Sequence, residues 1–160
     1  MREAKHLKWL MATERMAEMF STCSKKQYSC FVLESGTGRV VGFGYNGSPP
    51  LHPHCSDGHC PRFNEFSERP VLSGSSYDNC IANHAEANAL LWSNFSAGGE
   101  YTLIVNGPPC FSCCKLISST PVKTIVHLRD SSYLQYPVCL DFLATSGISV
   151  ISYSREDLKR

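Results

Sequence analysis

The chain of 160 residues has the length of one ordinary domain, and 42% of its residues are hydrophobic, which is enough to build a core. Its net charge is only +1, so the composition lacks the electrostatic footprint of a protein that grips long nucleic acids. No run approaches the roughly 20 apolar residues of a membrane-spanning helix, and the first residues lack the apolar segment of a secretory signal. We therefore expect a cytoplasmic protein with no membrane partner.

The nine cysteines are many for a protein of this kind. A disulfide framework is the usual interpretation of such a count, but it requires export from the cytoplasm. An odd number of cysteines also cannot pair completely within one chain. Thiolates that bind a metal ion are therefore the favoured interpretation.

The first third of the chain predicts a helix followed by a hairpin. Residues 5–21 carry apolar side chains at helical spacing. Residues 28–34 and 40–45 are rich in strand-forming residues and are joined by Gly-Thr-Gly at 36–38. Residues 46–79 show no periodic pattern and hold five prolines, together with Cys55 and Cys60. So long an irregular segment is uncommon in a compact domain unless it is functional or stapled.

The rest of the chain alternates helices and strands. Helices are predicted over 84–92, 111–118 and 138–145, and strands over 101–105, 124–128 and 148–153. Leu90, Leu91 and Trp92 are expected in the helix core. This alternation indicates an α/β fold, and the opening hairpin makes its central sheet mixed.

Two short motifs carry the chemistry. The chain reads His84-Ala85-Glu86 and later Pro109-Cys110-Phe111-Ser112-Cys113. Each motif opens a predicted helix, and together they form the H-x-E…P-C-x-x-C pattern of zinc-dependent nucleobase deaminases. Either half alone is a weak signal, but both in this order predict a catalytic zinc site.

The residue types suit hydrolytic deamination. His84, Cys110 and Cys113 are the predicted zinc ligands, and three protein ligands leave the fourth tetrahedral position open for water. Glu86 is the predicted proton shuttle, and the backbone N–H of Ala85 is a candidate donor to the substrate. Cys114 competes with Cys113 for the metal, but the C-x-x-C spacing favours Cys113, so we expect Cys114 to be a packed thiol.

The sequence resembles the deoxycytidylate deaminase family over nearly its whole length. The resemblance is carried by both motifs and by Thr-Cys-Ser-Lys-Lys at 22–26, Gly-Tyr-Asn-Gly at 44–47, His-Cys at 54–55 and Ser-Gly-Ile at 146–148. It implies a cytidine-deaminase-like three-layer α/β/α sandwich with a mixed central sheet. It also implies one deaminase domain over residues 1–160, with a Cys/His/Pro-rich insertion at about 46–83.

The resemblance implies further sites as well. Asn46 corresponds to a residue that binds the nucleotide sugar, although a plain strand-ending turn is the alternative there. A second, structural zinc is implied near the insertion, with Cys23, Cys55, Cys60 and Cys80 as candidate ligands, and with His54 and His59 as further candidates. A closed four-ligand site would order a segment that has no hydrophobic pattern. Related proteins commonly assemble, so a homo-oligomer is expected.

The sequence departs from the family where a 5′-phosphate would be recognised. The family's Thr-Cys segment continues with arginine and Val-Gly-Ala, whereas this chain has Ser-Lys-Lys-Gln-Tyr-Ser-Cys at 24–30. Lys25, Lys26 and Lys115 are alternative cations. The loop after the strand at 124–128 carries Arg129, Tyr133 and Tyr136, which are further candidates for a residue that closes over the ring or the phosphate.

The leading hypothesis is zinc-dependent deamination of a cytosine nucleotide or nucleoside, with dCMP to dUMP first. The alternative substrate is another aminated ring, namely a modified cytosine, guanine or a riboflavin-pathway pyrimidine. A non-catalytic, zinc-stabilised interaction module is a third hypothesis. Glu86 argues against it, because a structural zinc site needs no unligated carboxylate beside the metal.

Overall fold

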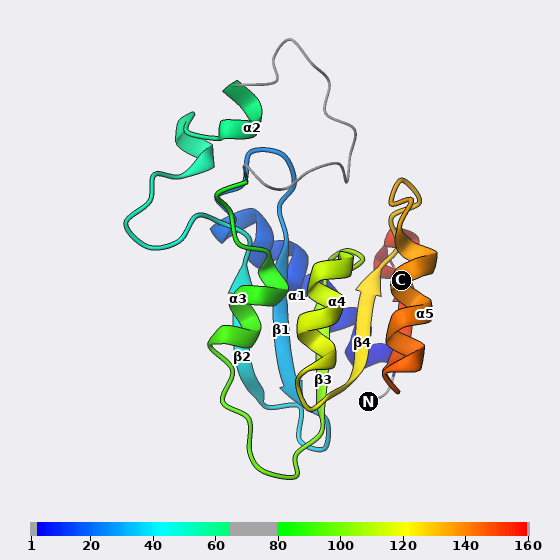
Figure 1. Ribbon diagram of the computed structural model, residues 1–160. Coiled ribbons are helices and arrows are strands. Elements are labelled where there is room, and N and C mark those ends of the chain that lie inside the picture. Colours follow the sequence, from blue (N-terminus) through cyan, green and yellow to red (C-terminus); the bar gives the residue numbers. More distant parts are fainter. Residues whose placement is uncertain (1–2, 65–79, 160) are drawn as a thin grey trace.

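A five-stranded mixed sheet forms the centre of the computed structural model, which describes residues 3–64 and 80–159 (Figure 1). The strands are β1 (Ser29–Glu34), β2 (Val40–Tyr45), β3 (Tyr101–Val105), β4 (Val122–Leu128) and β5 (Ser149–Tyr153), in the spatial order β2-β1-β3-β4-β5. β1 is antiparallel to both β2 and β3, whereas β3, β4 and β5 are parallel. The predicted α/β class with a mixed sheet is therefore confirmed.

Helices cover both faces of this sheet. The helix α1 (Glu3–Phe20) lies against one face, and α3 (Ala85–Leu91), α4 (Phe111–Ser118) and α5 (Tyr136–Thr145) lie side by side on the other (Figure 1). The parallel strands are connected through α4 and α5, and successive crossovers of one hand place both helices on the same face. The remaining described helices are short: η1 (Cys55–Asp57), α2 (Pro61–Asn64) and η2 (Arg155–Lys159). Among the described residues, no helix has the length and apolar character to cross a membrane.

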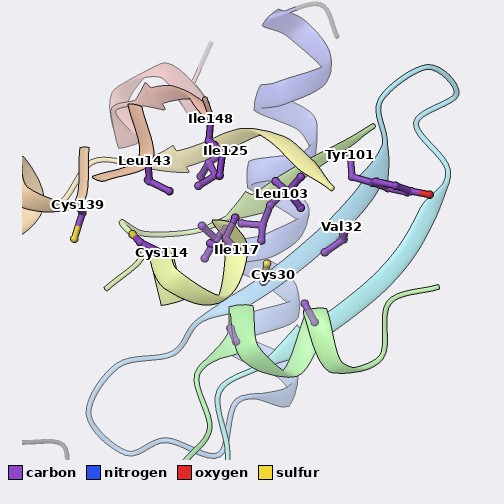
Figure 2. Packing of buried hydrophobic residues seen from close by; sticks show 14 residues of the cluster. Cys30, Val32, Tyr101, Leu103, Cys114, Ile117, Ile125, Cys139, Leu143 and Ile148 are labelled. Atoms are coloured by element: carbon purple, nitrogen blue, oxygen red, sulfur yellow. The ribbon is translucent and has the colours of Figure 1, made fainter. Parts of the chain in front are cut away.

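The sheet has a core on each side because its strands alternate their side chains. In β1, Val32 faces the three-helix layer while Phe31 and Leu33 face α1. Full burial of one such aliphatic side chain is worth about 1.5–3 kcal/mol. Figure 2 shows the larger core, whose labelled members are Cys30, Val32, Tyr101, Leu103, Cys114, Ile117, Ile125, Cys139, Leu143 and Ile148.

Most predicted elements are present, with three main differences. α5 begins at Tyr136, two residues before the predicted helix. β4 begins at Val122, two residues before the predicted strand. The prediction that Leu91 and Trp92 belong to the helix core is wrong, because they are 72% and 76% exposed and only Leu90 packs against the core. α3 ends at Leu91, so these side chains project at the end of the helix, where no element of the described part of the chain covers them. Part of the insertion, residues 65–79, lies outside the described residues.

Two glycines let α3 lie directly on β2. A methyl group at Gly44 would stand 2.3 Å from the backbone N of Ala89 and 2.6 Å from the carbonyl O of Ala85. At Gly42 it would stand 2.7 Å from the carbonyl O of Ala89. Backbone atoms cannot move aside as a flexible side chain does, so any larger residue pushes the helix away from the sheet.

We expect Gly44→Ala to lower the free energy of unfolding by about 1–3 kcal/mol, because the added methyl overpacks a backbone contact. Gly36→Ala is the matched control, since a methyl group there meets nothing within 4 Å. Urea unfolding of both variants checks this. Equal midpoints for Gly44→Ala and the unchanged protein would show that α3 is not tightly seated.

Candidate metal centre and active site

Two helix starts carry the predicted metal ligands. His84 is the N-cap residue of α3 and Cys110 is the N-cap residue of α4, and both have extended backbones with ψ of 153° and 164°. An N-cap side chain usually accepts a hydrogen bond from its own helix. Neither of these side chains does so. Neither side chain is therefore used to cap its own helix, and Cys113 lies in the first turn of α4.

The three side chains converge closely enough to hold a metal ion. The Nδ1 of His84 lies 3.3 Å from the Sγ of Cys110 and 3.4 Å from the Sγ of Cys113. All three ligand atoms lie within 4.8 Å of one another. Tetrahedral zinc with its usual bond lengths to sulfur and nitrogen would separate such atoms by about 3.5 Å. The donor set and its spacing therefore fit zinc, and the three residues leave one tetrahedral position open.

The electrostatics of the three side chains favour negative sulfur. Hydrogen bonds from the Cys113 thiol and from His84 lower the pKa of Cys110 to about 4. The pKa of Cys113 is raised because this thiol donates to Cys110, and burial adds to the effect. The hydrogen bond to Cys110 also raises the pKa of His84. Thiolate sulfur is the form that binds zinc, and the lowered pKa of Cys110 favours its thiolate near neutral pH.

Glu86 lies beside this cluster without belonging to it. Its side chain is only 6% exposed and lies in the first turn of α3. Burial raises the pKa of its carboxyl group above the ordinary range, while the nearby His84 opposes that shift. The Cys113 thiol donates a hydrogen bond to it. A carboxyl group whose pKa is raised toward neutrality is suited to accept and return a proton.

Neighbouring residues occupy definite positions. Cys114 is fully buried in the larger core, as expected for a packed thiol, and its Sγ lies 3.8 Å from the carbonyl O of Pro109. Ala85 is fully buried at the first position of α3. Lys26 pairs with Asp130, and Lys115 stands over the ring of Phe111.

Asn46 directly follows β2, and its side chain hydrogen-bonds to the loop that precedes β1. Its Oδ1 accepts hydrogen bonds from the Tyr28 backbone N–H at 2.7 Å and from the Ser21 hydroxyl at 2.6 Å. Its Nδ2 donates to the carbonyl O of Lys26 at 2.7 Å. This carboxamide therefore fixes the loop, and contact with a substrate sugar stays a prediction.

The insertion brings some of the other candidate ligands near one another. Cys55 and Cys60 are buried, and burial together with the adjacent Cys60 raises the pKa of Cys55 to about 11. Cys80 is half-buried, with its Sγ 3.9 Å from the carbonyl O of Ala82. Within residues 3–64 and 80–159, only the His84 set brings three ligand atoms into one cluster. A second zinc held by Cys23, Cys55, Cys60 and Cys80 stays a prediction.

One group of residues was not identified from the sequence. Tyr28, Asn106, Gly107 and Arg155 line a polar cleft together with residues of the loop that follows β4. Asn106 and Gly107 directly follow β3, and Tyr28 directly precedes β1. Position at a strand end was the available signal, because ligands of α/β sheets bind at that edge.

The comparisons with known proteins identify the family. The family model of the cytidine and deoxycytidylate deaminase zinc-binding region matches residues 3–129. The chain therefore belongs to this zinc-binding deaminase family, as its sequence motifs indicated.

Several relatives share much of the chain. The deoxycytidylate deaminase of Mycobacterium phage D29 is 35% identical over 112 residues, which cover 69% of this chain and 84% of the relative. The deoxycytidylate deaminase of Schizosaccharomyces pombe is 30% identical over 146 residues and 91% of this chain. The chain spans 43% of that relative and 44% of the Saccharomyces cerevisiae deoxycytidylate deaminase, less than half the length of either.

A solved structure confirms the fold. The dCMP deaminase of cyanophage S-TIM5, crystallised with dCMP and dUMP, has a TM-score of 0.70 and 22% identity. The match covers 96% of this chain and 99% of that protein. The cytidine-deaminase-like α/β/α sandwich predicted from the resemblance is therefore correct.

We expect Cys113→Ala and Cys110→Ala to lose one equivalent of zinc per chain, because two protein ligands hold the metal far more weakly than three. Cys114→Ala is the matched control and should retain this zinc. Metal analysis of the purified variants by mass spectrometry checks both. If Cys114→Ala loses zinc while Cys113→Ala retains it, the ligand assignment is wrong.

Proposed function

We propose that this protein is a zinc-dependent deaminase that converts deoxycytidylate to deoxyuridylate and releases ammonia. Membership in the zinc-binding deaminase family supports the reaction class. The names of the relatives from S. pombe and phage D29 support deoxycytidylate as the substrate. In this proposal, residues 1–160 form one deaminase domain and take a small nucleotide from the cytoplasm. A homo-oligomer is part of the same proposal.

The observation that carries the proposal is the position of Glu86. The carboxyl group is buried next to the three candidate ligands, yet it is not one of them. A zinc ion in a three-ligand site lowers the pKa of a water molecule, so that water can attack a ring carbon near neutral pH. A structural metal site would not require a buried carboxyl group at this place, whereas hydrolysis requires a proton carrier.

Glu86 moves protons in two steps. Its carboxylate accepts a proton from the attacking water. The resulting carboxylic acid then donates this proton to the ring nitrogen beside the reacting carbon. In the second step, Glu86 accepts the proton of the newly attached hydroxyl group and donates it to the amino group, which leaves as ammonia while the carbonyl bond of the product forms. The raised pKa of Glu86 suits this double role, because the carboxylate of an ordinary carboxyl group is a weaker base and accepts the proton of the water less readily.

The helix starts support the other parts of the reaction. The first backbone N–H groups of α4 have no partner within the helix and favour negative charge on Cys110. The backbone N–H of Ala85 is the proposed donor to the substrate ring. Asn46 is the proposed sugar contact, through the amide hydrogen that remains after its three hydrogen bonds to the loop.

We expect Glu86→Gln to lower kcat for dCMP by about 10²–10⁴-fold, because an amide cannot carry the proton, while the zinc content stays unchanged. Ammonia release and bound zinc are measured on the same preparation. Glu18→Gln, at an exposed position of α1, is the matched control and should keep full activity. Unchanged turnover in Glu86→Gln would contradict the mechanism, and deamination of guanine in preference to dCMP would contradict the substrate.

A further inference from the structure

A polar cleft of about 270 Å³ opens at one edge of the sheet, apart from the three metal-binding side chains. It is lined by Tyr28, Asn106, Gly107, Arg129, Asp130 and Arg155 among others. Asn106 and Gly107 follow β3, Arg129 and Asp130 follow β4, and Tyr28 precedes the antiparallel β1. The cleft therefore lies at the carboxyl edge of the parallel strands, where α/β folds bind ligands.

The cleft lies close to the candidate metal centre. Gly107 lines the cleft, and Cys110 follows it by three residues, so their Cα atoms are at most about 11 Å apart. One mononucleotide spans such a distance. In the cleft lining, the backbone of Gly107 lies directly against the ring of Tyr28, because a methyl group at Gly107 would stand 2.2 Å from that ring. A base held at the metal centre can thus direct its 5′-substituent toward the cleft.

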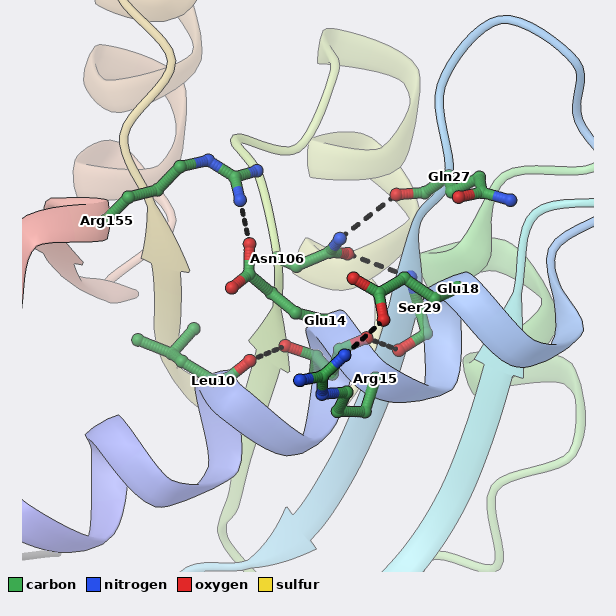
Figure 3. Close-up of polar contacts among 9 residues, drawn as sticks. Leu10, Glu14, Arg15, Glu18, Gln27, Ser29, Asn106 and Arg155 are labelled. Atoms are coloured by element: carbon green, nitrogen blue, oxygen red, sulfur yellow. Dashed lines mark hydrogen bonds and ion pairs between the residues drawn. The ribbon is translucent and has the colours of Figure 1, made fainter. Parts of the chain in front are cut away.

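Among the described residues, the charged side chains of the cleft lining and their ion-pair partners are three cations and two carboxylates, which leaves one positive charge in excess. Lys26 pairs with Asp130 at 2.9 Å. Hydrogen bonds from Ser132, and then Lys26, lower the pKa of Asp130 to about 2. Arg155 pairs with Glu14 of α1, and Asn106 is held by hydrogen bonds near them (Figure 3). Arg129 has no carboxylate partner among the described residues.

Arg129 is held in place from one side only. Its Nε donates to the hydroxyl of Ser152 at 3.1 Å, and its Nη2 donates to the carbonyl O of Ser152 at 3.2 Å. Ser152 also hydrogen-bonds the hydroxyl of Tyr136, which lies 2.6 Å from Nε2 of the buried His127. The side chain is thus anchored to β5 directly and to the start of α5 through Ser152, and its Nη1 has no hydrogen-bond partner among residues 3–64 and 80–159.

We propose that this cleft binds the 5′-phosphate of the substrate, with Arg129 as the principal donor and Ser152 as its positioning residue. The inference rests on the proposed function and assigns the part of the substrate that the two motifs leave unspecified. An arginine fork gives charged, directed hydrogen bonds to phosphate oxygens. The lysines at 25 and 115, which the sequence alone offered as alternatives, take no part in it.

The test compares a nucleotide with its nucleoside. The dissociation constants of dCMP and deoxycytidine are measured by calorimetry on zinc-loaded Glu86→Gln protein, with and without Arg129→Gln. We expect Arg129→Gln to weaken dCMP binding at least about tenfold, because it removes charge-assisted hydrogen bonds, and to leave deoxycytidine binding within about twofold. Ser152→Ala should weaken dCMP binding to a smaller extent. Arg39→Gln, in the distant β1–β2 hairpin, makes the same charge change and should alter neither constant.

Two results would overturn the inference: unchanged dCMP binding in Arg129→Gln, or an equal loss of binding for dCMP and deoxycytidine. Steady-state kinetics of the active protein, which keeps Glu86, distinguishes failure of the phosphate-site inference from failure of the proposed function. There, Arg129→Gln should raise the KM for dCMP while kcat and the deamination of deoxycytidine persist. Failure of the unchanged protein to deaminate any cytosine compound would refute the function itself, independently of Arg129.

Discussion

The candidate site depends on two helix starts meeting at one edge of the sheet. α3 can bring His84 to this edge only because Gly42 and Gly44 let its backbone lie against β2. α4 brings Cys110 and Cys113 there because it begins a few residues after the central strand β3. The separations of 3.3 and 3.4 Å between His84 and the two thiols are the result. A shift of either helix by 1 Å would spoil the geometry that zinc requires.

The edge of the sheet that carries the candidate metal ligands also carries charged groups of both signs close together. Buried thiolate and carboxyl groups on the three-helix side suit a cation, and the arginines beyond the strand ends suit an anion. Such an arrangement fits a substrate whose neutral ring reacts at one end and whose phosphate is held at the other. Arg129 is held by hydrogen bonds to the neutral Ser152 and not by a carboxylate, so its positive charge is not neutralised by the group that positions it.

Much of this could be predicted from the sequence because the signals are local. The strand Tyr101–Val105 and the helix Phe111–Ser118 have the bounds that periodicity predicts, and the two motifs identify the metal set. Contacts between distant segments could not be predicted. The cleft joins residues from near positions 28, 107, 129 and 155, which no spacing connects. Leu91 and Trp92 were misplaced because a helical pattern does not reveal where neighbouring elements stop covering the helix.

We propose that a metal held by His84, Cys110 and Cys113 is required for deamination of a cytosine nucleotide. The most direct measurement removes zinc with a chelator, follows ammonia release from dCMP, and then restores one equivalent of zinc. We expect turnover to disappear with the metal and to return when zinc is added, with the helical circular dichroism preserved throughout. Undiminished turnover by the fully zinc-free protein would contradict it.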